Sequence, residues 1–306
     1  MNDELRDNTP SGICEGAFCE VAPEVKLHYA QCGDPNAPLL LFVHGFPEFW
    51  FAWAGVMPAF AERWHVVAPD MRGYNLSSKP QSTQAYKPTA LIADLVALIR
   101  QLGNGRATVV AHDWGGALAW GLAIAHPELV ERLVILNAPH TIPFVRALSG
   151  DPEQQQASQY MNWLRRPGSE EKLAQNEFAL LERFFVGDSG APWFDGATRA
   201  RYHAAWSQPG ALSGGVNYYR ASPLYPPAGE DPGAAKLTLH EQDYLVRVPT
   251  LVIWGEADPA LRPVLLEGLE RVVENLRIER MPQASHWLIH EYPAAVIELI
   301  RPFIES

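Results

Sequence analysis

Residues 109–120 read VVAHDWGGALAW, and the pattern of the chain changes there at a single aspartate. The residues before Asp113 form a short apolar run rich in β-branched side chains, which is typical of a buried strand. Two glycines follow the aspartate and its neighbour, and then small and apolar residues with helical character. This stretch predicts a strand, a sharp turn and a helix, with Asp113 at the turn.

Five apolar runs of strand length occur along the chain, and segments with helical spacing separate them. Strands that are buried on both faces read as almost continuous hydrophobic runs, which is typical of a parallel sheet covered by helices. TALIADLVALIRQLG at 89–103 is one such helical segment, and PAAVIELIRPFIE at 293–305 is another. We therefore expect an α/β fold with a mostly parallel central sheet flanked by helices. The runs are PLLLFVHG at 38–45, WHVVAPD at 64–70, ATVVAHD at 107–113, LVILN at 133–137 and TLVIWG at 250–255.

A long insert of different composition separates the fourth run from the fifth. It is rich in Trp, Tyr, Arg and Gln, and it contains helix-forming patches such as SEEKLAQNEFALLERFF at 169–185. A crossover between parallel strands needs only about a dozen residues, so the insert is more than a connection. We expect residues 1–142 and 236–306 to form the core domain and residues 143–235 to form an inserted helical cap.

Length and charge exclude several classes of protein. With 306 residues, of which 47% are hydrophobic, the chain can bury a sizeable core and is not a disordered protein. The formal net charge of −11 argues against nucleic acid or an anionic membrane as a partner, because both need clustered Lys and Arg. No apolar run reaches the ~18 residues of a membrane span. We expect a globular protein that binds neither.

The cysteines and the N-terminal residues indicate a compartment. Cys14, Cys19 and Cys32 have neither the even count of a disulfide framework nor the paired spacing of a zinc site, so we expect reduced, structural thiols. The N-terminal stretch MNDELRDNTPSG, at 1–12, is acidic and polar and lacks the basic and apolar regions of a signal peptide. These features predict a cytoplasmic protein.

Three residues with potentially catalytic side chains follow predicted strands in a fixed order. Asp113 follows ATVVAH, Asp258 lies in LVIWGEADPA, and His286 lies in MPQASHWLIHEYP. Open α/β sheets place their functional sites at the carboxyl ends of the strands, so we expect these side chains to meet. A nucleophile followed by an acid and then a histidine is the chain order of the α/β-hydrolase fold.

Five short motifs carry a resemblance to a known family: HGFPE at 44–48, DMRGYNLSSKP at 70–80, HDWGG at 112–116, GEADPA at 255–260 and SHW at 285–287. Along almost its whole length the chain resembles the α/β-hydrolase superfamily, and within it the branch of epoxide hydrolases and haloalkane dehalogenases, whose nucleophile is an aspartate. The resemblance implies that the backbone N–H groups of Phe46 and Trp114 form an oxyanion hole. It implies no cofactor and no metal.

An aspartate suits chemistry that a serine does not. A carboxylate is ionised at pH 7 and can displace a leaving group at saturated carbon, whereas a serine needs a base and attacks carbonyl groups. Attack by Asp113 would leave an alkyl ester on the protein. His286, held in one tautomer by Asp258, would then deprotonate the water that cleaves this ester. Each oxyanion-hole donor is typically worth ~3 kcal/mol in such a step.

Each of these residues also has a simpler explanation. An aspartate after a strand is often the N-cap of the next helix, or here the trace of a lost serine. The two glycines after it, with Asp258 and His286 in order, favour the nucleophile for Asp113. Four other candidates are expected to be structural or second choice: Asp70, which lacks the glycines, His44 and His112, which we expect to be packed or hydrogen-bonded, and Glu256, the rival of Asp258.

Two tyrosines of the insert distinguish between the two branches. A phenol with a pKa of about 10 stays protonated at neutral pH and can protonate a developing alkoxide. Epoxide hydrolases carry one tyrosine seven residues before a Pro-Gly and one in an Asn-aromatic-Tyr-Arg motif, and this chain has YMNWLRRPG from Tyr160 and NYYR ending at Arg220. The resemblance therefore implies Tyr160 and Tyr219 as proton donors, although packing usually explains a lone tyrosine.

The residues beside the nucleophile agree with this choice. Trp114 fits both branches, because either one often carries Trp there. Phe46 replaces the Asn that many haloalkane dehalogenases use to hold halide, and a fluoroacetate dehalogenase would have arginines where Trp114 and Ala117 stand. An epoxide hydrolase is the preferred interpretation, with a haloalkane dehalogenase or a non-catalytic ligand-binding member of the fold as alternatives.

The expected partner is a small hydrophobic organic substrate, an epoxide. Aromatic side chains are candidates for an apolar pocket wall, although packing explains aromatic residues too. A homodimer is left open. The candidate wall residues are Phe46, Trp50, Trp114, Trp163 and Tyr218.

Overall fold

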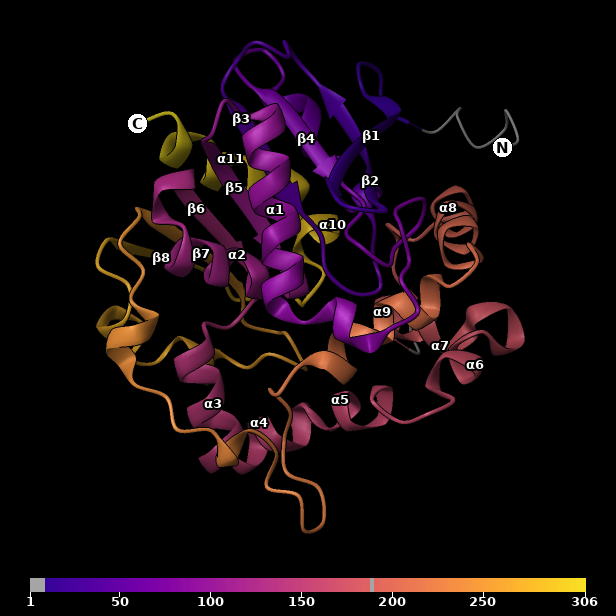
Figure 1. Ribbon diagram of the computed structural model, residues 1–306, viewed down its shortest axis with the longest axis vertical. Coiled ribbons are helices and arrows are strands. Elements are labelled where there is room, and N and C mark those ends of the chain that lie inside the picture. The colour runs from indigo at the N-terminus through magenta and orange to yellow at the C-terminus, as the bar shows by residue number, and fades with distance from the viewer. Residues whose placement is uncertain (1–8, 188–189) are drawn as a thin grey trace.

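The computed structural model describes residues 9–187 and 190–306, which form an eight-stranded sheet with helices on both faces (Figure 1). The strand order is β1-β2-β4-β3-β5-β6-β7-β8. Six neighbouring strands, from β4 to β8 in this order, pair in parallel, and β2 and β1 are added antiparallel at one edge. The strands are β1 (Cys14–Ala22), β2 (Val25–Cys32), β3 (Leu39–Val43), β4 (His65–Pro69), β5 (Ala107–His112), β6 (Val130–Leu136), β7 (Thr250–Gly255) and β8 (Leu276–Met281).

The five predicted strands are confirmed as β3 to β7, and the mostly parallel α/β fold with them. All residues of β3, β4, β5 and β7 are buried, which explains their continuous apolar runs. Sequence reasoning missed β1, β2 and β8. The two edge strands, β1 and β8, are partly exposed along most of their length, so polar and charged residues interrupt their apolar pattern.

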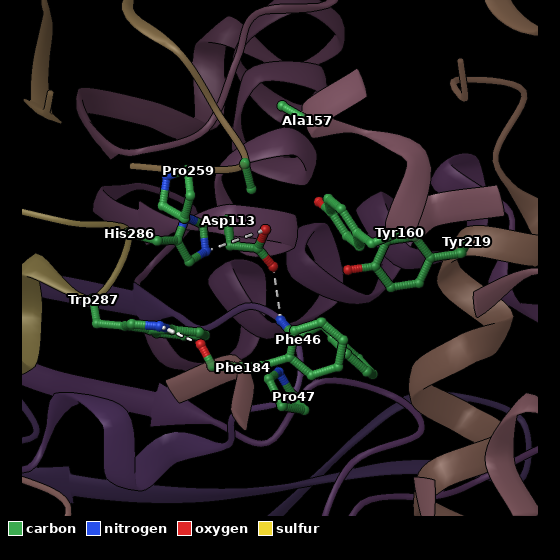
Figure 2. A pocket seen from close by; sticks show the side chains of 11 residues that line it. Phe46, Pro47, Asp113, Ala157, Tyr160, Phe184, Tyr219, Pro259, His286 and Trp287 are labelled. Atoms are coloured by element: carbon green, nitrogen blue, oxygen red, sulfur yellow. Dashed lines mark hydrogen bonds and ion pairs between the residues drawn. The ribbon is translucent and has the colours of Figure 1, made fainter. Parts of the chain in front are cut away.

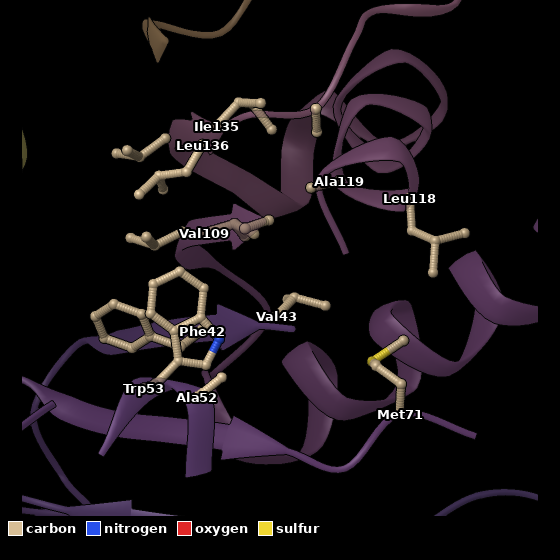
Figure 3. Close-up of a cluster of buried hydrophobic side chains, with 14 of the residues drawn as sticks. Phe42, Val43, Ala52, Trp53, Met71, Val109, Leu118, Ala119, Ile135 and Leu136 are labelled. Atoms are coloured by element: carbon tan, nitrogen blue, oxygen red, sulfur yellow. The ribbon is translucent and has the colours of Figure 1, made fainter. Parts of the chain in front are cut away.

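Helices α1 (Pro88–Leu102) and α2 (Asp113–Ala125) cover the near face of the sheet in Figure 1, and α11 (Pro293–Ile304) lies behind it. The short helix α10 (Leu288–Glu291) precedes α11. The apolar core fills the space between the layers, and Figure 3 shows part of it, where Phe42 of β3 lies against Trp53. Full burial of a side chain such as Phe42 contributes roughly 1.5–3 kcal/mol to stability.

The described residues between β6 and β7 form seven α-helices, and Figure 1 shows these gathered at one end of the sheet. The helix-forming patch at 169–185 contains α6 and most of α7, and α7 is itself kinked near its start, where Asn176, Glu177 and Phe178 have left-handed backbone angles. The division into core and cap at 142/143 and 235/236 stays a prediction. The helices are α3 (Thr141–Gly150), α4 (Pro152–Ala157), α5 (Gln159–Leu164), α6 (Ser169–Leu173), α7 (Gln175–Val186), α8 (Gly196–Trp206) and α9 (Ala211–Ala221).

The three cysteines are free. Cys19 and Cys32 are buried, but Cys14 is exposed on the edge strand β1, so a packing role fits only two of them. Most of the N-terminal stretch interpreted above, residues 1–8, lies outside the described residues. Within the described part of the chain, no helix combines the length and the apolar character needed to cross a membrane.

Candidate active site

Asp113 stands at the tight turn that the sequence predicted. Strand β5 ends at His112, helix α2 begins at Asp113, and the aspartate has a φ of +50°, which a non-glycine residue rarely adopts. The glycines that follow allow the helix to approach the sheet closely. A Cβ on Gly115 would lie 2.3 Å from the carbonyl oxygen of Val43, so no other residue fits there without a shift. The turn exposes the Asp113 carboxylate at the carboxyl edge of the sheet.

His286 and Asp258 meet in the loops that follow β8 and β7. The distance from His286 Nδ1 to Asp258 Oδ2 is 2.7 Å, which fixes the ring orientation. Asn137, at the end of β6, donates from Nδ2 to the same oxygen at 2.7 Å. The other oxygen, Oδ1, accepts from the backbone N–H groups of Ala260 and Leu261 at 2.8 and 2.9 Å. Asp258 is therefore a buried, fully hydrogen-bonded carboxylate.

The three predicted triad residues lie together, with His286 between the carboxylates of Asp113 and Asp258. Figure 2 shows the His286 ring beside the Asp113 carboxylate. Its Oδ2 atom lies 3.7 Å from His286 Nε2, and its Oδ1 atom accepts the backbone N–H of Phe46 at 2.8 Å. The Phe46 amide thus contacts the group on which negative charge would develop. The Trp114 amide belongs to the first turn of α2, and its part in an oxyanion hole stays a prediction.

Electrostatics favour charge on both members of the His286–Asp258 pair. Burial alone would raise the pKa of Asp258, but the charge and hydrogen bond of His286 hold that pKa below its usual range. Burial opposes protonation of His286, yet the carboxylates of Asp258 and then Asp113 outweigh it and raise the pKa of His286 to about 9. While Asp113 carries its charge, His286 is therefore an imidazolium at neutral pH.

Tyr160 of α5 and Tyr219 of α9 stand opposite the carboxylate. Their ring centroids are 6.1 Å apart, and Figure 2 shows both hydroxyl ends directed towards Asp113. Burial and the charge of Asp113 raise the pKa of Tyr160, although its side chain remains partly accessible from the cavity. Burial, followed by the neighbouring Tyr160 phenol and the charge of Asp113, also raises the pKa of Tyr219. Both phenols therefore stay protonated and able to donate at neutral pH.

Two cavities open at this constellation. The smaller one, about 240 Å³, is the one in Figure 2 and is lined by His286, Phe46 and Trp287 beside apolar residues. The larger one, about 410 Å³, runs along α2 and is lined by Trp114 among mainly apolar side chains. Phe46 and Trp114 are thus wall residues, as expected.

The structure corrects the other three predicted wall residues, because Trp50, Trp163 and Tyr218 line neither cavity. Trp50 is fully buried in the core of the fold. The Tyr218 hydroxyl donates to the backbone carbonyl of Arg72 at 2.8 Å, and its ring packs against Tyr74, so it is a packing residue. Trp163 is only partly buried and packs against the hydrophobic core.

The residues judged structural from the sequence do have structural partners. Asp70 is buried and accepts bonds from His28, from the Trp50 backbone and from Asn75. His44 accepts the Met71 backbone N–H through Nε2, and His112 Nε2 bonds to the carbonyl of His286 at 2.8 Å. Glu256, the rival of Asp258, pairs with Arg280 in a solvent-accessible position.

Sequence reasoning assigned no role to two residues that support the site. Asn137 was read only as the end of a strand, yet its side chain ties Asp258 to the Gly255 backbone. Glu48 is buried two residues after Phe46, where it bonds to His290 at 2.6 Å and to the Tyr202 hydroxyl of α8 at 3.0 Å. A polar residue at the end of an apolar strand and an acid within HGFPE were the available signals.

Comparison with known proteins agrees with this geometry. The family described as alpha/beta hydrolase fold matches residues 38–293. The AB hydrolase superfamily protein YfhM of Bacillus subtilis is 36% identical, over 92% of this chain and 95% of that protein. Epoxide hydrolase 4 of Homo sapiens is 33% identical, over 98% of this chain and 83% of that protein. An epoxide hydrolase from Bacillus megaterium, solved in complex with an inhibitor, superimposes with a TM-score of 0.86 at 32% identity, over 95% of this chain and 100% of that one.

The fold, the site and these relatives define the class: the chain belongs to the α/β-hydrolase superfamily. Within that superfamily it belongs with the epoxide hydrolases, at 32–33% identity over nearly the whole chain to the two named above.

Proposed function

We propose that this enzyme converts an epoxide and water into a vicinal diol through a covalent ester on Asp113. The observation that carries the proposal is one arrangement: a carboxylate bonded to the Phe46 amide, with His286 on one side and two protonated tyrosines opposite. Epoxide hydrolases among the relatives support the substrate class.

In the first step, Asp113 attacks one carbon of the epoxide ring. A bond forms between a carboxylate oxygen and that carbon, and the carbon–oxygen bond of the ring breaks. The oxygen that is released stays attached to the neighbouring carbon and takes a proton from Tyr160 or Tyr219. The product of this step is a hydroxyalkyl ester of Asp113, with a tyrosinate beside it.

In the second step, His286 takes a proton from water, and the resulting hydroxide attacks the ester carbonyl of Asp113. The Phe46 amide stabilises the oxyanion that forms on the former carboxylate oxygen. The ester bond then breaks, the leaving alkoxide takes the proton from His286, and the diol is released. The new carboxyl group gives up its proton, and the tyrosinate regains one.

Formation of the ester prepares His286 for its role as base. The charge of Asp113 is one of the causes that raise the pKa of His286 to about 9. The ester has no such charge, so the pKa of His286 falls once the ester has formed. His286 is therefore easier to deprotonate once the ester has formed and a base is needed, and Asp258 keeps the ring aligned.

A haloalkane dehalogenase would need free N–H donors for the halide. The Trp114 ring instead meets Tyr219 edge-on, with centroids 5.1 Å apart, and the paired tyrosines are suited to an oxygen that stays on the substrate. Product analysis on epoxides and on matched haloalkanes tests the assignment. We expect diols from epoxides and no halide release, and Asp113→Asn should lower turnover by roughly 10⁴-fold or more. Halide release without diol formation would contradict the proposal.

The helical insert and the cellular location complete the proposal. We propose that residues 143–235 form a cap over the site, since they contribute both tyrosines. The three free cysteines support a cytoplasmic location.

A further inference from the structure

The two cavities have three lining residues in common, and these are Asp113, Tyr160 and Tyr219. They are the proposed nucleophile and the two proposed proton donors. An epoxide held between them has Asp113 on one side of its ring and the hydroxyl groups on the other. The groups attached to its two carbons must then enter the two cavities.

The larger cavity is long and apolar. It follows one face of α2 from Asp113 to Ile124, which at the rise of an α-helix is roughly 16 Å. Apart from Asp113, none of its lining side chains is Lys, Arg, His, Asp or Glu. The α2 residues along it are Trp114, Ala117, Leu118, Gly121 and Ile124, and the facing walls include Ile92, Phe144, Met161, Leu224, Leu237 and Leu239.

The smaller cavity contains the base. His286 lines it and does not line the larger one, so the water that His286 activates must approach the Asp113 carbonyl from this side. A water molecule takes about 30 Å³. The smaller cavity has a volume of about 240 Å³, and its walls include Pro47, Ala157 and Phe184. The hydrolytic water occupies part of this volume, so less of it is left for the substrate.

We propose that the two cavities have separate tasks: the larger one takes a long apolar substituent on one epoxide carbon, and the smaller one keeps room for the hydrolytic water. The inference rests on the proposed function. The substrates are then epoxides with one long or bulky uncharged substituent, terminal epoxides above all. Ile124, in the larger cavity, limits the length of that substituent. Ala157, in the smaller cavity, limits the size of any group on the other epoxide carbon.

The direct test uses the unmodified enzyme and two isomers, 1,2-epoxydecane and trans-5,6-epoxydecane, with 1,2-epoxybutane for comparison. Burial of each further methylene should raise kcat/KM about fourfold along the terminal series until the cavity is filled. The terminal isomer should exceed the internal isomer in kcat/KM by roughly tenfold or more, because the internal one forces a butyl group into the cavity of the water.

Two enlarging substitutions separate the cavities. Ile124→Trp fills the far end of the larger one and should lower the ratio of kcat/KM for 1,2-epoxydecane over 1,2-epoxybutane. Ala157→Leu narrows the smaller one and should lower the ratio for trans-5,6-epoxydecane over 1,2-epoxydecane. Each variant serves as the size-matched control of the other, and ratios of kcat/KM do not depend on the fraction of folded enzyme.

Three outcomes are distinct. Diol formation that follows chain length and disfavours the internal isomer supports the inference. The inference is overturned if every epoxide gives diol with no dependence on chain length. It is also overturned if both variants affect all three substrates equally. In either case the larger cavity is only an entry path. No diol from any epoxide overturns the proposed function itself.

Discussion

His286 Nε2 lies 3.7 Å from Asp113 Oδ2, farther than a hydrogen bond allows but close enough for the two charges to act on each other. The carboxylate oxygen therefore remains free to attack. The same spacing leaves the imidazole beside the carbonyl that the second step must hydrolyse. One pair of residues thus serves both halves of the reaction.

Removal of the base should separate the two steps. In His286→Gln, Asp113 can still form the ester, but no group deprotonates the water that cleaves it. We expect the enzyme to consume at most one equivalent of epoxide per site with little release of diol, and mass spectrometry should show an Asp113 peptide heavier by the mass of one substrate. Asp113→Asn is the matched control and should carry no added mass. Rapid steady turnover by His286→Gln would contradict the assigned role.

Loss of the hydroxyl group should reduce kcat/KM at Tyr160 and at Tyr219 but not at the neighbouring Tyr218. Tyr160→Phe and Tyr219→Phe should each lower kcat/KM by roughly 10²-fold, because each loses one donor to the developing alkoxide. Tyr218→Phe is the control, because its hydroxyl bonds to the Arg72 carbonyl and not to the cavity. It should lower stability by about 1 kcal/mol, read from denaturation, with little effect on kcat/KM. Equal losses of kcat/KM in all three variants would refute the selection of Tyr160 and Tyr219.

The pKa of His286 should depend on the charge of Asp113. With Asp113 ionised, that pKa is about 9, so the imidazole is protonated at neutral pH. Loss of the negative charge disfavours the imidazolium, so the pKa should fall in Asp113→Asn and in the ester. Ester hydrolysis, followed in single turnovers, should therefore rise with pH and level off at a pKa below about 9. An NMR titration of His286 in both proteins measures the same shift, and identical curves would exclude the coupling.

The fold could be predicted wherever burial left a simple pattern. Strands β3, β4, β5 and β7 are buried throughout, so each reads as an apolar run. The edge strand β8 is partly exposed along its whole length and mixes charged with apolar residues, so it lacks an apolar run. The kink near the start of α7 consists of three left-handed residues, and none of them is a glycine that would have indicated it in the sequence.

The site could be predicted where chemistry demands a particular residue type, as at Asp113 and His286. The wall of the cavities could not, because an aromatic residue packs equally well in a core, as Trp50 does. Support for Asp258 by Asn137 depends on two strands meeting at the sheet edge, 121 residues apart in the chain. Only the three-dimensional arrangement shows such a contact.

A single turnover in water enriched in ¹⁸O tests the ester on Asp113 most directly. Enzyme in excess over a terminal epoxide is allowed to turn over once, and both the diol and the Asp113 peptide are analysed by mass spectrometry. Because water attacks the aspartyl carbonyl, the label should appear in the Asp113 carboxylate, and the diol should carry an unlabelled oxygen from the enzyme. Label found in the diol with an unlabelled Asp113 would show direct attack by water and contradict the account.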